Sequence, residues 1–412
     1  MRKGKNHLKF FGFFLFIAVF FSVVKLMPNL TKGKIFSETK PAFANTIEIQ
    51  TIVESDPSLI YLPLVLREQI NPNKFFGIIM PVYWSEENVK TYMPEADLLA
   101  GGKKHSAVSW GIDIQDPALY EPWQSDNDLN KNNLYRQLEQ LWLEGYFSFV
   151  KIGSSSTIRE ISEGDYDNQL NQMAQIYKRW LDNGGGRKAM FAPFQEMNGA
   201  EWVPYYSDDE EPEQRQAIYK EAYYYIQKIF QINGVDRSQI LWVFSPNGGS
   251  SPEENFELYY PGDEYVDLVG FAAYNFGYCP ATLKIIEGVE EDRGNWENYD
   301  RIFEPYINRF LQMAPSKYIL ISETGTSALT SRKAQINGDY DYEMKAKWLE
   351  DNYGWLANQP MVLGIFYFDF NDLGAETCDL GIPRDDFLGY QNAIANPKFG
   401  FLTMNDITTK IH

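Results

Sequence analysis

Histidine is scarce in this sequence, and its scarcity narrows the chemistry that the protein can perform. Only His7, His105 and His412 are present, and the first and last of these lie near the chain ends. A Ser-His-Asp triad would have to run through His105, and a metal site made of several histidines cannot be built. Chemistry must therefore rest mainly on carboxylates, and we expect neither a metal nor an organic cofactor.

Positive charge is also in deficit. The sequence has 37 lysines and arginines against 56 aspartates and glutamates, which gives a net charge of −19 and a pI near 4.7. This excess of negative charge argues against nucleic acid and against anionic polysaccharides as partners, because both would be repelled. A neutral glycan would not be repelled.

The N-terminal apolar run is too short for an ordinary membrane span. The uncharged run Phe10–Val24 follows four basic residues within positions 2–9, and a membrane-spanning helix needs about 20 apolar residues. A basic segment before a short apolar run is typical of an export signal. We predict a signal peptide or an uncleaved signal anchor over residues 1–27. Both alternatives stay open, because the small-x-small triplet at 42–44 lies far beyond the apolar run.

Export would place the rest of the chain outside the cytoplasm. We therefore expect a secreted or cell-surface monomer that touches a membrane only if its N-terminal segment is uncleaved. Cysteine is almost absent, and the two that occur, Cys279 and Cys378, would meet an oxidising environment. A disulfide between them is possible, although the sequence alone does not show that they touch.

Residues 28–72 contain no convincing amphipathic helix, and we interpret them as a spacer. Beyond residue 73, apolar runs rich in Val, Ile, Phe or Tyr alternate with helical patterns. The runs do not alternate strictly between apolar and polar residues, as expected of parallel strands covered on both faces. Eight such runs occur, at residues 75–81, 107–114, 147–152, 189–194, 240–244, 266–273, 318–321 and 362–368.

Between these runs, apolar residues recur at helical spacing, for example over 170–181, 218–230 and 302–311. Eight strand–helix units predict an α/β fold with a single (β/α)₈ TIM barrel over residues 73–405. An open doubly wound sheet is the alternative. No GxGxxG motif follows the first predicted strand, which argues against it.

Active sites of such barrels lie at the carboxyl ends of the strands, and there the sequence places two glutamates. Glu196 follows the fourth predicted strand and Glu323 follows the seventh. Hydrolysis of a glycosidic bond needs one carboxyl group that gives a proton and another that is ionised. The aromatic content of 16% suits this interpretation, because sugar rings stack on aromatic faces, although a core rich in aromatic residues is an equal explanation.

Two motifs resemble those of glycoside hydrolase family 26. Residues 191–199 (FAPFQEMNG), followed by Trp202, are similar to the acid/base motif of that family, and residues 321–325 (ISETG) are similar to its nucleophile motif. Asn247 and residues 270–275 (GFAAYN) stand on the expected intervening strands. The resemblance covers roughly residues 73–400.

The resemblance implies a clan A barrel and a retaining, endo-acting hydrolase of a neutral β-linked polysaccharide. It implies that Glu196 is the general acid/base, that Glu323 is the nucleophile and that Tyr274 donates a hydrogen bond to Glu323. It further implies a set of substrate-binding residues, namely Gln195, Asn198, Trp202, Asn247, Tyr274 and Tyr367, with Trp202 as an aromatic wall and Tyr367 at the place of a Trp platform.

The sequence departs from the family at three of these places. Gln195 stands where His is common, Ala272 where an acidic residue is common, and Tyr367 where Trp is usual. The resemblance makes β-mannan the first expectation for the substrate, and because of these three departures β-glucan and β-xylan stay as alternatives. A carbohydrate-binding protein that has lost catalysis on the same barrel is the rival function, and the presence of both glutamates argues against it.

Overall fold

The computed structural model describes most of the chain beyond residue 71. The described residues are 72–80, 86–120, 132–199, 203–207, 209–248, 255–279, 283–286, 289–292, 295–369, 378–384 and 387–411. The chain divides into two compact units, Met1–Ile70 and Asn71–His412. The predicted export signal and all of the predicted spacer except Pro72 lie outside the described residues, so only the second unit is described below.

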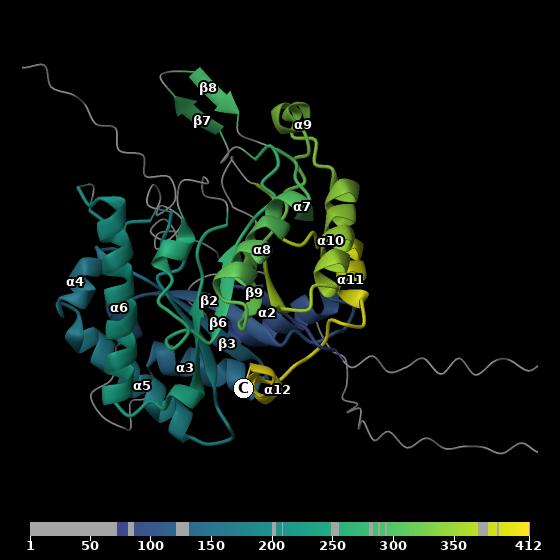
Figure 1. Ribbon diagram of the computed structural model, residues 1–412. Coiled ribbons are helices and arrows are strands. Elements are labelled where there is room, and N and C mark those ends of the chain that lie inside the picture. The colour runs from purple at the N-terminus through teal and green to yellow at the C-terminus, as the bar shows by residue number, and fades with distance from the viewer. Residues whose placement is uncertain are drawn as a thin grey trace, which may run out of the picture. The chain divides into compact units, whose positions relative to one another are not determined.

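Eight parallel strands close into a barrel in the order β1-β10-β9-β6-β5-β4-β3-β2. Each predicted apolar run holds one of them, so the predicted (β/α)₈ barrel is confirmed (Figure 1). The strands are β1 (Phe75–Ile79), β2 (Ala107–Asp113), β3 (Phe147–Gly153), β4 (Ala189–Pro193), β5 (Ile240–Phe244), β6 (Leu268–Ala272), β9 (Tyr318–Thr324) and β10 (Val362–Phe368).

Helices follow the strands and cover the outside of the barrel (Figure 1). The three predicted helical stretches fall in α5, α6 and the pair α7 and α8. The α-helices are α2 (Glu86–Leu99), α3 (Asn133–Leu143), α4 (Ile158–Ser162), α5 (Asp167–Asp182), α6 (Pro212–Ile232), α7 (Tyr299–Ile302), α8 (Glu304–Met313), α9 (Arg332–Asn337), α10 (Tyr342–Ala357), α11 (Leu388–Ala395) and α12 (Met404–Ile411). Short 3₁₀ helices are η2 (Pro117–Leu119), η4 (Arg237–Gln239) and η5 (Phe256–Tyr259).

The sequence did not predict the antiparallel hairpin of β7 (Leu283–Ile286) and β8 (Val289–Asp292), which is inserted after β6. Figure 1 shows this hairpin and α9, which follows β9, towards the same end of the view. Both insertions leave from the carboxyl ends of barrel strands. They therefore lie at the end of the barrel that carries the active site in this fold.

Side chains of the strands alternate between two cores. One core fills the barrel interior and contains Phe147 and Phe149 of β3, together with Met404 and Ile407 of α12. The other core lies between the barrel and its helices and contains Val150 and Ile152 of the same strand, among others. This alternation decides which strand residues can reach the mouth of the barrel, since only inward-facing positions do so.

No helix within the described part of the chain is long and apolar enough to cross a membrane.

Candidate active site

Glu196 stands on a tight turn directly after β4. Both Phe194 and Glu196 have left-handed backbone conformations, with φ of 50° and 58°, which are uncommon for residues other than glycine. The turn is held by neighbouring strands, because the Phe194 amide donates to the Ile152 carbonyl (2.6 Å) and the Glu196 amide to the Ser245 carbonyl (2.8 Å). Strained backbone of this kind persists where the surroundings hold it, commonly at functional sites.

A clasp of two asparagines orients the Glu196 carboxylate. The Asn247 side-chain amide donates to Glu196 Oε1 at 2.9 Å. The Asn198 side chain in turn accepts a hydrogen bond from the Asn247 amide (2.8 Å) and donates to its carbonyl (3.0 Å). Asn198 thus fixes Asn247, and Asn247 fixes Glu196, which is only 8% exposed.

Glu323 reaches the barrel mouth because of an irregularity in β9. Phe271 of β6 pairs with Ile321, but the next residue, Ala272, pairs with Glu323, so Ser322 is an extra residue in the ladder. Ser322 faces the barrel interior, where its hydroxyl hydrogen-bonds that of Ser245 at 2.7 Å. Strict alternation would then turn Glu323 outward. The bulge re-aims it inward, as bulges near active sites commonly do.

Two side chains from other strands hold the Glu323 carboxylate. The Tyr274 hydroxyl, just beyond β6, donates to Glu323 Oε2 at 2.6 Å. The Lys151 ammonium, from β3, forms an ion pair and hydrogen bond with Glu323 Oε1. Burial raises the pKa of Tyr274 well above its usual value, and the negative charge of Glu323 raises it further. Tyr274 therefore remains a hydrogen-bond donor throughout the ordinary pH range.

The two glutamates share one electrostatic environment. The negative charges of Glu196 and Glu323 raise the pKa of Lys151, of Tyr274 and of the buried Tyr205. Glu323 is 9% exposed and Glu196 8%, so both carboxylates are nearly buried yet retain a small accessible surface. A pair of carboxylates at one barrel mouth, one held by an amide and the other by a phenol and an ammonium, can supply the acid and the nucleophile of glycoside hydrolysis.

The sequence did not predict Lys151. The signal was present, because a lysine in the middle of an apolar strand, two residues after the inward-facing Phe149, must point into the barrel.

The structure places the remaining predicted site residues in different surroundings. Gln195 is half-buried beside Glu196, and its side-chain oxygen has no hydrogen-bond partner among the described residues. Asn247 and Tyr274 make the contacts given above. Trp202 lies outside the described residues. The disulfide between Cys279 and Cys378, which the sequence left open, is present.

Two predictions need correction. Asn198 is 0% exposed and both ends of its amide bind Asn247, so it supports the acid residue and has no surface for a sugar. Tyr367 is also 0% exposed, because it lies on the outward face of β10 and packs against Tyr390. The next residue, Phe368, faces inward and meets the Tyr274 ring edge-on at 5.7 Å. A shift of one residue along a strand reverses the face, so Phe368, not Tyr367, is the aromatic residue at the mouth.

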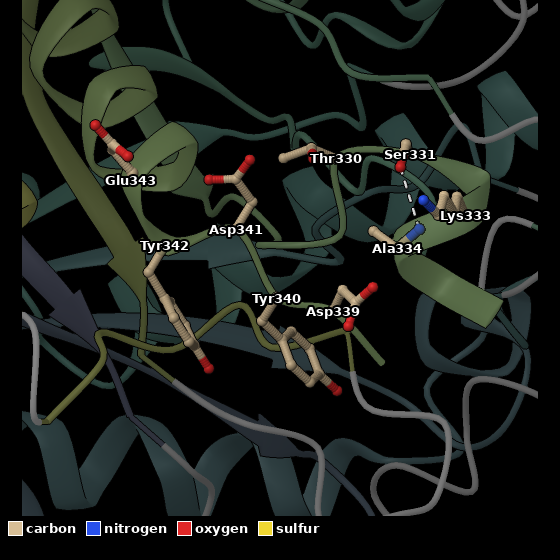
Figure 2. A pocket seen from close by; sticks show the side chains of 9 residues that line it. All are labelled: Thr330, Ser331, Lys333, Ala334, Asp339, Tyr340, Asp341, Tyr342 and Glu343. Atoms are coloured by element: carbon tan, nitrogen blue, oxygen red, sulfur yellow. Dashed lines mark hydrogen bonds between the residues drawn. The ribbon is translucent and has the colours of Figure 1, made fainter. Parts of the chain in front are cut away.

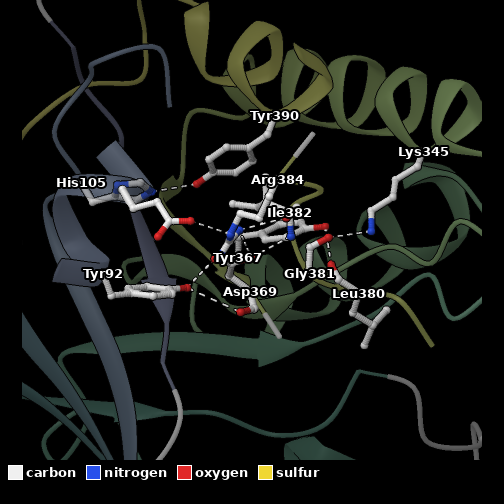
Figure 3. Close-up of polar contacts among 11 residues, drawn as sticks. Tyr92, His105, Lys345, Tyr367, Asp369, Leu380, Gly381, Ile382, Arg384 and Tyr390 are labelled. Carbon is white, nitrogen blue, oxygen red and sulfur yellow. Dashed lines mark hydrogen bonds and ion pairs between the residues drawn. The ribbon is translucent and has the colours of Figure 1, made fainter. Parts of the chain in front are cut away.

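Tyr367 instead helps to anchor residues 378–384, which follow β10. Its hydroxyl donates to the Leu380 carbonyl at 2.8 Å, while the Lys345 ammonium of α10 donates to the Gly381 carbonyl at 2.7 Å. Asp369 accepts from the Ile382 amide at 2.7 Å, from Arg384 and from Tyr92 (Figure 3). With three donors, Asp369 is an anchor for this segment and not a third catalytic carboxylate.

His105 also has a supporting position. It precedes β2 and is buried, with Nδ1 2.7 Å from Asp97 Oδ1. Its Nε2 lies 2.9 Å from the Tyr390 hydroxyl (Figure 3). It therefore lies toward the amino end of a barrel strand, away from the mouth. Within the described residues, no group of three or more His, Cys, Asp or Glu side chains is arranged to hold a metal ion.

An open pocket of about 580 Å³ lies elsewhere, along α9 and the start of α10. Figure 2 shows the side chains that line it, including Tyr340 and Tyr342, whose rings are nearly parallel with centroids 6.0 Å apart. None of the predicted site residues lines this pocket. The glutamates, not this pocket, therefore define the candidate active site.

Fold and site together define a class of protein. A closed (β/α)₈ barrel whose mouth holds two nearly buried glutamates from the fourth and seventh barrel strands has the arrangement typical of carboxylate-based glycoside hydrolases. The family model for glycosyl hydrolase family 26 matches residues 152–345. The matched segment belongs to that family, and the resemblance drawn from the two glutamate motifs is confirmed.

Curated relatives agree with this family. "Endoglucanase H" of Acetivibrio thermocellus is 25% identical over 202 residues, which cover 47% of this chain and 20% of the relative. "Mannan endo-1,4-beta-mannosidase" of Bacillus subtilis is 37% identical over 95 residues, which cover 22% of this chain and 24% of the relative. The similarity thus spans a quarter or less of the length of these two relatives.

Solved structures share the fold at low sequence identity. The catalytic domain of a family 26 endo-β-1,4-mannanase from Bacillus sp. JAMB-750 is 16% identical with a TM-score of 0.53, covering 80% of this chain and 88% of that one. A family 26 β-mannanase from Bacteroides ovatus is 13% identical with a TM-score of 0.50, covering 81% of this chain and 91% of that one.

Proposed function

We propose that this protein is a retaining, endo-acting glycoside hydrolase that cleaves a neutral β-linked polysaccharide by double displacement. One observation carries the proposal. Two carboxylates that are distant in the sequence stand at one barrel mouth, with different partners. Glu323 is held by a phenol and an ammonium, and Glu196 by a neutral amide. The ammonium and phenol beside Glu323 and the amide beside Glu196 give the two carboxylates the different surroundings that a nucleophile and an acid need.

The first half of the reaction forms a bond between the sugar and the enzyme. A carboxylate oxygen of Glu323 attacks the anomeric carbon, and the bond from that carbon to the leaving oxygen breaks. Glu196 gives its proton to the leaving oxygen, so the aglycone departs as a neutral hydroxyl. Tyr274 keeps the attacking carboxylate oriented through its hydrogen bond to Oε2.

The second half releases the sugar. Glu196, now ionised, takes a proton from a water molecule whose oxygen attacks the anomeric carbon, and Glu323 leaves as a carboxylate. Two inversions at the same carbon restore the original configuration. The Asn198–Asn247 clasp serves both halves, because it holds Glu196 in the same place while its protonation changes.

The net charge of the protein and the aromatic rings beside Glu323 favour a neutral glycan as the substrate. The net charge of −19 would repel an anionic chain, while Phe368 and the stacked rings of Tyr274 and Phe276 provide aromatic surface beside Glu323. β-Mannan is the first choice of substrate, with mixed-linkage β-glucan and β-xylan next. The names of the relatives, a mannosidase of mannan and an endoglucanase, support these choices.

The site of action is proposed to be outside the cytoplasm. The basic and apolar residues within 1–27 are typical of an export signal, and the Cys279–Cys378 bond suits an oxidising compartment.

Activity against pure polysaccharides tests the proposed function. The purified chain should release reducing ends from at least one of the three glycans, and proton NMR should show that the first product keeps the β configuration. Glu323→Ala should abolish turnover on every substrate, whereas the matched control Glu213→Ala, at an exposed position in the first turn of α6, should leave it unchanged. Inversion of configuration, or full activity of Glu323→Ala, would overturn the mechanism. Binding without turnover by the wild type would favour a carbohydrate-binding protein.

Glu196→Ala separates the acid from the nucleophile. It should slow cleavage of polysaccharide strongly but spare aryl glycosides with good leaving groups, because those need little help from an acid. An equal loss on both kinds of substrate would contradict the acid role.

A further inference from the structure

Lys151 is an ammonium group buried inside the barrel. It belongs to β3, whose inward residues Phe147 and Phe149 lie in the barrel core, and it is only 3% exposed. β3 and β9 stand four strands apart in a barrel of eight, so the two strands face each other across it. The long lysine side chain therefore crosses the barrel and pairs with Glu323 on the opposite wall. Below the ammonium group lies the Phe149 ring, with its centroid 5.6 Å away.

Burying the Lys151 ammonium group costs free energy unless its charge has partners. Removing an ammonium ion from water costs several kcal/mol even after the protein relaxes, and burial lowers the pKa of Lys151. The two carboxylates oppose this effect, Glu323 through direct contact and Glu196 through its charge. One cation thus faces both glutamates.

Within the part of the chain that the structure describes, the other titratable groups around Lys151 do not offer a second cation. Asp113 on β2, in register with Gly153 of β3, adds a carboxylate whose Oδ1 accepts from the Gln115 amide at 2.9 Å. Tyr205 and Tyr274 face the same space, and burial raises the pKa of both, so they stay neutral. Among the described residues, Lys151 therefore brings a positive charge to both glutamates.

We propose that Lys151 is a counter-ion that the two glutamates share in turn, pairing with Glu323 in the free enzyme and with Glu196 while Glu323 is bonded to the sugar. The proposal rests on the proposed double displacement. It assigns Lys151 as a positioning residue that acts through both carboxylates.

The charges of the reaction explain why one shared cation suits this site. In the free enzyme Glu323 is ionised and Glu196 carries a proton, so these two groups and Lys151 sum to zero. In the covalent intermediate Glu323 has become a neutral ester and Glu196 has lost its proton to the leaving group. The sum is again zero. Without Lys151 the nearly buried pair would carry one uncompensated negative charge in both states, which is unfavourable at low dielectric.

The pH profile of catalysis tests the sharing. An opposite charge a few ångströms away shifts the titration of a carboxylate by about 1–3 units. In Lys151→Met, which replaces the ammonium with an apolar chain of similar length, both limbs of the kcat/KM profile should move to higher pH. Both limbs move in the same direction because the variant removes a positive charge that faces both carboxylates. Lys151→Arg keeps the charge and should restore both limbs.

Other outcomes separate this proposal from a structural role. A shift of the acid limb alone would mean that Lys151 serves Glu323 only, and would overturn the sharing. A uniform loss of kcat at every pH would mean that the lysine merely fills space, and would also overturn it. The acid limb of kcat, measured with an activated aryl glycoside whose second step is slow, should move upward as well, because it reports Glu196 in the intermediate.

A double-mutant cycle of unfolding free energies tests the ion pair even if Lys151→Met folds poorly. The single variants Lys151→Met and Glu323→Gln and their double variant are compared by denaturant unfolding. The double variant should be more stable than the sum of the two single losses predicts, because it leaves no unpaired buried charge. Additive losses would contradict the ion pair. If the wild-type chain has no turnover on any glycan or aryl glycoside, the proposed function fails, and this result is distinct from an active enzyme whose profile does not move.

Discussion

The hydrogen bond from Tyr274 to Glu323 allows a prediction about which step of the reaction it serves. Tyr274→Phe removes the hydroxyl and keeps the ring, which stacks on Phe276 and meets Phe368 edge-on. The lost bond is 2.6 Å long and ends on a carboxylate. Hydrogen bonds to charged groups contribute about 1.5–3 kcal/mol. Each 1.36 kcal/mol is a factor of ten in rate, so the full loss corresponds to about 10- to 150-fold.

The loss should fall mainly on the release of the sugar. In the second step the Glu323 carboxylate regains its negative charge, so the hydrogen bond strengthens towards that transition state. In the first step the charge is consumed and the bond weakens. We therefore expect that kcat for an activated aryl glycoside, whose second step is slow, falls by about 10- to 150-fold. The KM should fall with it, because the covalent intermediate accumulates.

The assay is steady-state kinetics with a rapid-mixing burst measurement. A burst of aglycone equal to the enzyme concentration should appear in Tyr274→Phe. The matched control is Tyr177→Phe, since Tyr177 is a buried tyrosine of α5 whose hydroxyl has no hydrogen-bond partner among the described residues. The control should keep wild-type kinetics. A Tyr274→Phe enzyme whose kcat stays within a factor of about three of wild type would refute this reasoning, since so small a loss lies below the range expected for a charged hydrogen bond.

Three further predictions concern the supports of the site. Asn198→Ala should lower the free energy of unfolding by about 1–3 kcal/mol, because it removes two buried hydrogen bonds to the Asn247 backbone, and should lower activity on polysaccharide; unchanged activity would show that Glu196 needs no clasp. Reduction of the Cys279–Cys378 bond, which closes a loop of 99 residues, should lower the free energy of unfolding by about 4.7 kcal/mol in the chain-entropy account, and a melting temperature unaffected by reductant would contradict this. Burial lowers the pKa of Lys345 from 10.5 to about 8, so between these two values the unfolded chain binds more protons than the folded one and stability should rise with pH. The difference in unfolding free energy between wild type and Lys345→Met should therefore grow in favour of wild type from pH 8 to pH 10.5, by at most about 3 kcal/mol, and a decrease would reverse the assigned sign.

The sequence predicted the barrel well, because each parallel strand is a continuous apolar run with a helix after it. Buried parallel strands must be apolar on both faces, so their pattern survives in the sequence without knowledge of the pairing. The β7–β8 hairpin was missed, because its segment 283–292 holds several acidic residues and lies inside a long connection where no apolar run stands out.

The two glutamates were also predictable, because position at a strand end decides their location. The directions of side chains around them were less predictable. Tyr367 and Phe368 exchange roles through a difference of one residue, and register shifts between β9 and β10 fall beside them. Glu323 itself faces inward only because Ser322 forms a bulge. Motif likeness identifies a strand end, but bulges and register decide which side chain turns inward.

Asn198 illustrates a second limit of prediction from the sequence. An asparagine two residues after a predicted acid suggests a sugar ligand, and only the contact with the Asn247 backbone shows that it is a support. Lys151 illustrates the opposite case, since a charged residue within a core strand carried information that the apolar pattern obscured.

The identity of the nucleophile is the claim on which the mechanism depends, and mass spectrometry of the trapped enzyme tests it most directly. A deoxyfluoro glycosyl fluoride matched to the preferred glycan slows the second step and leaves the sugar attached to the attacking residue. Peptide mapping should place one sugar on Glu323 of the wild-type chain. A label on any other residue, or an active enzyme that takes up no label while inverting its product, would contradict the account.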